Sequence, residues 1–98
     1  RFTAPADPQR PLHAAMLMGV DVAASSLEDA GELVANAIID LIRQLGLPNG
    51  LAAVGYSPDD VEELVSGTMP QHRVTKLAPR PAGPDELRHL FLESMTLW

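Results

Sequence analysis

The chain has 98 residues, a length that fits a single domain with one modest core. Hydrophobic residues make up 46% of the sequence and aromatic residues only 4%, and the predominance of alanine, leucine and valine favours helices over strands. The net charge of −6 argues against nucleic acid or an anionic membrane as a partner, and the absence of cysteine excludes disulfides and thiolate metal sites.

The sequence also lacks features of export or membrane insertion. No apolar run approaches the ~20 residues needed to span a bilayer. The first residues, Arg1 to Pro5, lack the apolar core of a secretory signal peptide. Because the chain does not start with Met, we expect sequence upstream of it. A reducing, cytoplasmic location is the expectation that fits a chain without cysteine.

A first helix is predicted between Asp7 and Gly19. Asp7 is a suitable N-cap and Pro8 suits the first turn, although Pro11 leaves the starting residue open because it removes an early backbone donor. Gly19 is a plausible C-terminal stop. The apolar side chains of this helix are Leu12, Ala15, Met16 and Leu17.

The second predicted helix has the clearest pattern in the chain. Two overlapping capping boxes precede it, Ser25 with Glu28 and Ser26 with Asp29. Its end is predicted at Gly46, shortly before Pro48. Apolar residues follow one stripe with a period of 3.6: Leu27, Ala30, Leu33, Val34, Ala37, Ile38, Leu41, Ile42 and Leu45.

The second half of the chain predicts further helices. Residues 49–54 form a short helical turn that Gly55 closes, and a helix follows from Ser57 to Gly67. Residues 68–83 hold three prolines and are expected to be irregular or extended. A last helix starts at Gly83 and places Leu87, Leu90, Phe91, Ser94 and Trp98 at helical spacing. The sequence therefore predicts one all-α domain over residues 1–98, with four to five packed helices.

No self-sufficient active site is visible in this pattern. His89 and Glu93 have the spacing of helical metal ligands, but two ligands do not make a site. His13 is expected to be packed or half-exposed in its helix. The glycines are scattered singly, which argues against a dinucleotide or phosphate-binding loop, and the serines fit helix caps better than nucleophiles. We therefore assign no catalytic, cofactor-binding or metal-binding residue to this chain.

Two stretches carry a family resemblance. Residues 1–6, 17–19 and 45–55 resemble an extended N-terminal segment, a helix that ends in glycine, and a hinge of the form "lG-x-P-x-x-L-x-x-vG". Residues 67–80 resemble the late loop of iron-containing (group III) alcohol dehydrogenases, whose usual ending is "T-x-x-N-P-R"; here Ala78 replaces the Asn. The amino-acid sequence of this loop is most similar to that of the hydroxyacid-oxoacid transhydrogenase branch.

The resemblance implies a two-domain oxidoreductase of which this chain is the C-terminal helical domain. Such enzymes bind NAD(P) in an N-terminal α/β domain and hold a divalent metal, iron or zinc, through one Asp and three His in the cleft between the domains. By this resemblance the ligands and the nucleotide domain lie upstream, so we expect this chain alone to bind neither cofactor and to be inactive. The implied substrate is a small alcohol or hydroxy acid.

One loop is predicted to approach the cleft, namely His72, Arg73, Val74, Thr75 and Lys76. The resemblance implies that Val74 and Thr75 lie closest to nicotinamide and substrate. Between Gln71 and Arg80 there are three bases and no acid, so Arg73 or Lys76 is a candidate partner for a substrate carboxylate. The alternative, which is the commoner fate of such side chains, is that Lys76 and Arg80 pair with the acidic helices.

Other functional interpretations remain open from the sequence. The chain could be a freestanding helical module for protein interaction or oligomerisation, with the amphipathic second helix as its docking face. A glycerol or maleylacetate-reducing relative in the same superfamily is a further alternative. If the chain is a domain without its partner domain, its uncovered apolar face predicts self-association.

Overall fold

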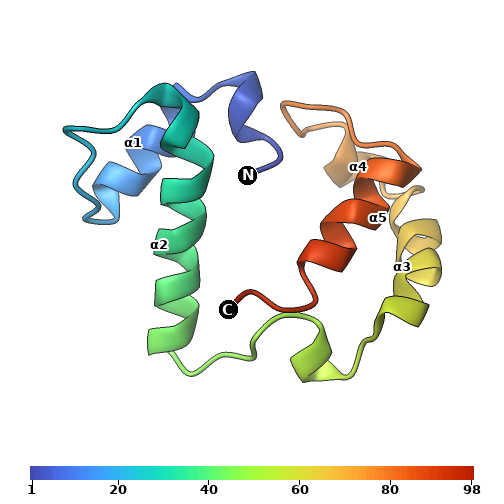
Figure 1. The fold of residues 1–98 in the computed structure, drawn as a ribbon. Coiled ribbons are helices and arrows are strands. Elements are labelled where there is room, and N and C mark those ends of the chain that lie inside the picture. Colours follow the sequence, from blue (N-terminus) through green and yellow to red (C-terminus); the bar gives the residue numbers. More distant parts are fainter. The chain divides into compact units, whose positions relative to one another are not determined.

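The structure is a computed structural model, and it describes residues 1–98 except for the side chain of Val74. All regular structure in this described part is helical, which confirms the predicted all-α class (Figure 1). None of the described helices combines the length and apolarity needed to cross a membrane. The α-helices are α1 (Gln9–Leu17), α2 (Ala30–Gln44), α3 (Val61–Thr68), α4 (His72–Thr75) and α5 (Pro84–Glu93). The 3₁₀ turns are η1 (Ala4–Ala6), η2 (Leu27–Asp29), η3 (Ala52–Val54) and η4 (Pro58–Asp60).

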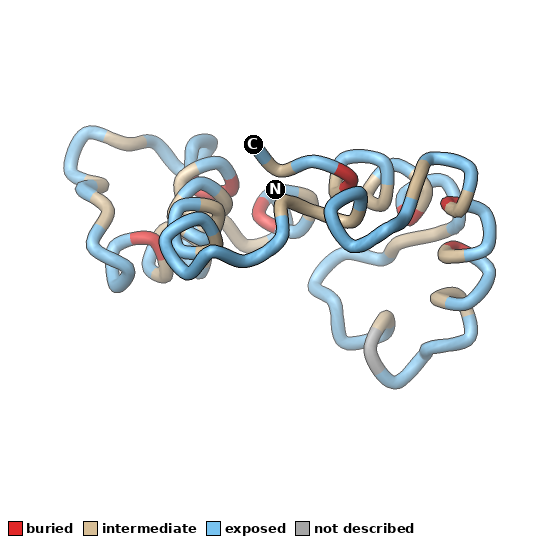
Figure 2. The backbone as a smooth tube through the Cα atoms, turned by 90° about the horizontal axis from the view of Figure 1, so that it is seen from below, coloured by how far each residue is buried: buried red, intermediate tan, exposed pale blue. Residues whose placement is uncertain are grey.

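The helices form two compact units, Arg1–Leu45 and Gly46–Trp98, where the sequence analysis expected one bundle. Each unit buries its own few residues, which Figure 2 shows as short, separate stretches of the tube. The physical reason is that a helical apolar stripe indicates only which face is buried and does not name the partner helix. The break falls at Gly46, whose positive φ of 66° ends α2.

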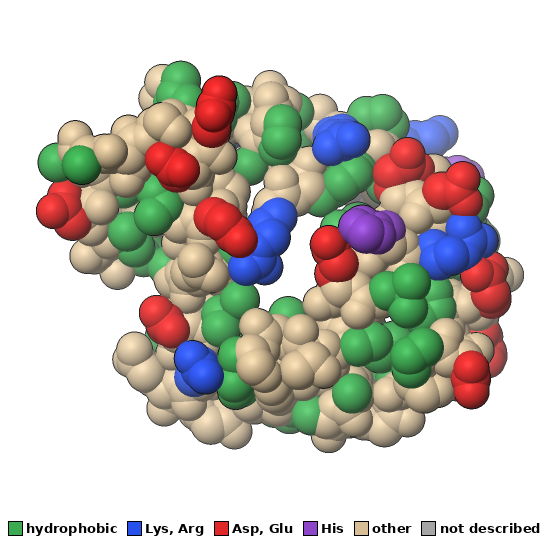
Figure 3. All heavy atoms as spheres, in the orientation of Figure 1, with side chains coloured by type: hydrophobic (Ala, Val, Ile, Leu, Met, Phe, Trp, Pro, Cys, Tyr) green, Lys and Arg blue, Asp and Glu red, His purple; other side chains and the backbone are tan. Residues whose placement is uncertain are grey.

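The N-terminal unit is built on the contact between α1 and α2, and its buried residues are small. Ala15 and Ala30 are fully buried, and Ala4 and Gly31 are also buried. Small side chains allow the backbones of packed segments to approach closely, so this unit has tight contacts but few large apolar side chains inside. Acidic side chains are spread over its visible face (Figure 3).

The two helices of this unit begin and end as the local sequence requires. α1 starts at Gln9, so Pro11 falls in the first turn, where a backbone N–H has no intrahelical acceptor and its absence costs no hydrogen bond. At the start of the second helical segment, the backbone N–H and the hydroxyl of Ser26 both donate to Asp29 Oδ2, at 2.8 and 2.9 Å. Of the two predicted capping boxes, the structure therefore forms the one between Ser26 and Asp29.

The C-terminal unit has a separate core between α3 and α5. Val61, Val65, Leu87 and Met95 are buried together. Four partly buried residues pack around them: Leu51, Met69, Ala82 and Phe91. Burying a large apolar side chain contributes roughly 1.5–3 kcal/mol, so this cluster is the main source of stability in the unit.

An ion-pair network joins the same two helices at their surface. Arg88 Nε lies 2.5 Å from Glu62 Oε1, and Arg88 Nη1 lies 2.5 Å from Asp85 Oδ1. The hydrogen bond from Arg88 is the main cause that lowers the pKa of Glu62 below its ordinary value. The arginine thus links α5 to the start of α3 at the surface.

Three predicted boundaries differ in the structure. α3 continues through Gly67 to Thr68, whose hydroxyl donates to the carbonyl of Leu64 at 2.8 Å. Residues 72–75, expected to be irregular, form the single turn α4, because the backbone N–H of Thr75 reaches the carbonyl of Gln71 at 3.0 Å. α5 ends at Glu93, so Trp98 lies beyond the helix that was predicted to include it.

The last residues of the chain are held by the hinge that opens this unit. The side-chain oxygen of Asn49 accepts the backbone N–H groups of Leu97 and Trp98, at 2.8 and 3.1 Å. The backbone N–H of Leu51 donates to the carbonyl of Ser94 at 2.9 Å. The hinge and the C-terminal segment are therefore joined by several hydrogen bonds.

Candidate functional site

The predicted cleft-proximal loop lines part of an open pocket of about 450 Å³ in the C-terminal unit. The pocket is bounded by α4, by the end of α3 and by the chain that leads into α5. Its lining residues are Met69, His72, Thr75, Lys76, Ala78, Pro81 and Ala82. Four of these seven have apolar side chains, so the pocket combines an apolar wall with a small set of polar groups.

The structure brings together three of the five predicted loop residues. His72, Thr75 and Lys76 line the pocket, and Arg73 is exposed without lining it. The side chain of Val74 lies outside the described residues. The turn of α4 explains which of these residues line the pocket, because positions 72, 75 and 76 are neighbours on one helical face.

The polar groups of the pocket differ in the hydrogen bonds and ion pairs that they already form. The hydroxyl of Thr75 donates to the carbonyl of Gln71 at 3.2 Å, which leaves its oxygen lone pairs as acceptors. Lys76 forms no ion pair with any carboxylate among the described side chains. The lysine pairing with an acidic helix that one interpretation expected is thus not found in the described part of the chain.

The other two histidines are not among the lining residues of this pocket. His13 is exposed on α1, where the sequence analysis expected a packed or half-exposed side chain. His89 Nε2 lies 3.1 Å from Glu93 Oε1, and both side chains are largely exposed. No three His, Cys, Asp or Glu side chains among the described residues lie together as a metal site would require. The residues present therefore do not fit the divalent metal that the family resemblance implies.

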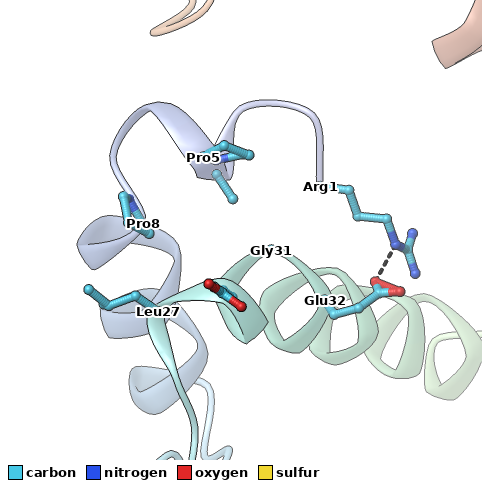
Figure 4. A pocket seen from close by; sticks show the side chains of 8 residues that line it. Arg1, Pro5, Pro8, Leu27, Gly31 and Glu32 are labelled. Atoms are coloured by element: carbon cyan, nitrogen blue, oxygen red, sulfur yellow. Dashed lines mark hydrogen bonds and ion pairs between the residues drawn. The ribbon is translucent and has the colours of Figure 1, made fainter.

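Sequence reasoning missed a second pocket, of about 540 Å³, in the N-terminal unit. Figure 4 shows Pro8 and Leu27 at one end of it, and Arg1 and Glu32 joined by an ion pair at the other. Its remaining lining residues are Ala4, Pro5, Glu28 and Gly31. It contains no histidine and no hydroxyl nucleophile, and its guanidinium is already paired with Glu32, so it offers no evident chemistry. No pattern in the sequence indicates that the N-terminal segment folds across α2.

A β-carbon at position 31 would lie 3.0 Å from the β-carbon of Ala4 and 3.3 Å from the α-carbon of Arg1. Gly31 therefore allows the N-terminal segment to cross α2 closely, and this crossing forms the second pocket. Glycine in a helix is otherwise unfavourable by roughly 1 kcal/mol relative to alanine. The close crossing is the physical reason for a glycine at this position.

Comparison with known proteins shows which proteins this chain resembles. No family model matches the chain, and no solved structure matches it. Over its whole length, however, the chain is related to the iron-containing alcohol dehydrogenases, which confirms the predicted resemblance. More particularly, it is related to the hydroxyacid-oxoacid transhydrogenase branch of that family.

The individual matches extend across all or nearly all of the chain. It is 50% identical over 98 residues to a probable mitochondrial hydroxyacid-oxoacid transhydrogenase of Dictyostelium discoideum, of which it spans 18%. It is 44% identical over 97 residues to the mitochondrial hydroxyacid-oxoacid transhydrogenases of Rattus norvegicus and Homo sapiens, of which it spans 21%. The chain therefore spans about a fifth of the length of these relatives.

These relatives correct one prediction. The expected cytoplasmic location is wrong in the light of the matches, because the related enzymes are named as mitochondrial. The expectation relied on the lack of cysteine and of a long apolar run. Both features are compatible with either compartment, so neither could distinguish them.

Proposed function

We propose that this chain is the C-terminal helical domain of a metal-dependent, NAD(P)-linked oxidoreductase that acts on an alcohol or hydroxy acid. The observation that carries the proposal is the identity of 44–50% along essentially the whole chain to three transhydrogenases that are about five times as long. A match that covers the whole of this chain but only about a fifth of the relative is typical of a segment of such an enzyme.

The surface of α2 supports a missing partner domain. Ile38, Leu41 and Leu45 are 45, 47 and 64% exposed, and their spacing places them on one stripe of the helix. Apolar side chains repeated along one helical face are typical of a face that packs against another element. We propose that the N-terminal nucleotide-binding domain covers this stripe.

The proposed role of the chain is to wall the catalytic cleft and to present the loop of α4 to the substrate. By the family resemblance, the metal and the nucleotide would be held by polypeptide upstream of this chain. The chain alone would therefore be inactive.

The test is to express the longer open reading frame that contains this sequence and to measure hydride exchange between a hydroxy acid and an oxo acid. We expect turnover by the longer polypeptide with a divalent metal and none by the 98-residue chain. Turnover by the 98-residue chain would overturn the proposed division of labour. A longer polypeptide that carries no nucleotide-binding domain would overturn the proposal as a whole.

The exposed stripe on α2 also favours a second candidate function, a freestanding interaction or oligomerisation module. In that case the chain would self-associate through the stripe, and Leu41→Glu would abolish the association because it places a charge in the apolar contact. Sedimentation velocity of both forms over a range of concentrations distinguishes the two. Specific dimers in the absence of any longer open reading frame would favour this alternative.

A further inference from the structure

The pocket beside α4 lies in a stretch of the sequence that holds several bases and no acid. Between Glu63 and Asp85 the sequence holds Arg73, Lys76 and Arg80 and no aspartate or glutamate. The rest of the chain is acidic, since all thirteen acids of a molecule with net charge −6 lie outside this stretch. This local excess of bases favours an anion as the ligand of the pocket.

Lys76 is the one lysine or arginine among the lining residues of the pocket, and it lies beside an apolar wall. Lys76 lines the pocket together with the side chains of Met69, Ala78, Pro81 and Ala82. Lysine is a point charge that suits one carboxylate, whereas phosphate recognition commonly uses several donors from backbone groups or arginines. An apolar wall next to one ammonium fits a molecule with a carboxylate at one end and a short aliphatic body.

The other polar groups lie where they can meet the remainder of such a molecule. The oxygen of Thr75 retains acceptor capacity, and the ring nitrogens of His72 can donate or accept. A hydroxyl or carbonyl group on the ligand would find a partner in either side chain. The volume of about 450 Å³ lies within the usual range for small-molecule sites.

We propose that this pocket binds the carboxylate of a small hydroxy or oxo acid, with Lys76 as its ion partner and Met69 and Pro81 against its aliphatic body. That this acid is a substrate rests on the proposed function. Lys76 is then a specificity residue, because a neutral alcohol of the same length gains nothing from the ammonium.

The experiment titrates the ¹⁵N-labelled 98-residue chain with butyrate and, separately, with butyramide and inorganic phosphate at constant ionic strength. We expect saturable shifts of amide signals from residues 69–82 with butyrate alone. Because one exposed lysine supplies the charge, the expected Kd is on the order of 10 mM. Binding of butyramide or phosphate as tight as that of butyrate would overturn the proposal, since the pocket would then be a general apolar or anionic surface.

Variants assign the effect to the lysine. Lys76→Met is expected to weaken butyrate binding at least about fivefold, and Lys76→Arg to restore most of it. Arg10→Met is the matched control, because it also removes one exposed positive charge but lies on α1, outside this pocket. Equal weakening by Lys76→Met and Arg10→Met would overturn the assignment, as would the absence of any butyrate-induced shift.

A second measurement separates this inference from the proposed function. In the longer enzyme, Lys76→Met should raise KM for a hydroxy acid with little change in kcat, because the ion pair is equally present in the ground state and the transition state. If the longer polypeptide has no oxidoreductase activity, the proposed function fails while Lys76-dependent butyrate binding still supports the pocket. If it is active and Lys76→Met leaves KM unchanged, the pocket assignment alone is overturned.

Discussion

At the scale of single residues, Gly50 leaves less room for a β-carbon than any other glycine of the chain. Its φ is +76°, and a β-carbon there would lie 2.5 Å from the carbonyl oxygen of Met95. Gly46 has a similar φ of +66° but open space around it, so it serves as the control. We expect Gly46→Ala to lower the free energy of unfolding by about 1–2 kcal/mol, the strain of a left-handed residue. Gly50→Ala should cost clearly more, because the backbone of the C-terminal segment must also move. Equal losses of unfolding free energy for the two variants, measured by urea denaturation, would show that this contact does not contribute to stability.

A second residue-scale prediction concerns pH and the start of α2. Hydrogen bonds from Ser26, first from its backbone N–H and then from its hydroxyl, lower the pKa of Asp29 below the ordinary value of 3.8. A pKa that is lower in the folded than in the unfolded state gives a stabilisation that is complete above the ordinary value and is lost as pH falls through the lowered one. Acidification below about pH 4 should therefore reduce helical content in part through this cap.

The check is circular dichroism from neutral to acidic pH on the native chain and on Asp29→Asn. The variant should have less helix at neutral pH and should lose less on acidification, because its cap cannot titrate. Other carboxylates such as Glu62 titrate in both proteins, so the informative quantity is the difference between the two curves. A difference that does not vary with pH would contradict the prediction.

Individual residues also show what the sequence can and cannot predict about the site. The charge pattern and the loop motif singled out residues 72–76, of which His72, Thr75 and Lys76 line one pocket and Arg73 does not. The apolar wall, which includes Met69 and Pro81, was not predicted, because residues 68–83 were expected to be irregular or extended. The pocket at Gly31 was missed since close backbone crossings leave no periodic pattern.

At the scale of elements, the contact between α3 and α5 allows a comparison of core packing with surface charge. Leu87→Ala should lower the free energy of unfolding by about 2–4 kcal/mol, because it leaves a cavity among buried side chains. Arg88→Met should cost less, since its ion partners Glu62 and Asp85 are 70 and 92% exposed and therefore screened by solvent. Urea denaturation at low and high salt measures both losses. High salt should diminish only the loss of unfolding free energy caused by Arg88→Met. A larger loss for Arg88→Met than for Leu87→Ala would show that the charge network dominates this interface.

Local signals predicted most of the elements, and the departures have local causes. Caps and positive-φ glycines, such as Ser57 before α3 and Gly55 after η3, lie where they were expected. Gly67 did not end its helix, because its φ is not positive and only a glycine that adopts the left-handed region closes a helix. The turn α4 was not expected between Pro70 and Pro79, since proline density predicts an irregular chain but leaves room for one turn between prolines.

At the scale of the whole molecule, the division into two units was not predictable from the helical pattern. Periodicity indicates the buried face of each helix, and α1, α2, α3 and α5 all show one. It does not indicate that α1 pairs with α2 and α3 with α5, because that choice depends on shape and on chain connection. The result is two small cores, one of alanine and glycine and one of larger side chains.

Two separate cores predict that the units lose structure independently. Leu87→Ala should increase amide hydrogen exchange in α3 and α5 while exchange in α1 and α2 stays as in the native chain, because no side chain of the altered core belongs to the N-terminal unit. Ala15→Leu is the reciprocal variant. Ala15 is fully buried, so the added side-chain volume must separate α1 from α2 and raise exchange there alone. Hydrogen exchange followed by mass spectrometry on peptides from each unit measures both effects. If either substitution raises exchange across both units equally, the chain opens as one cooperative body, and the two cores depend on each other.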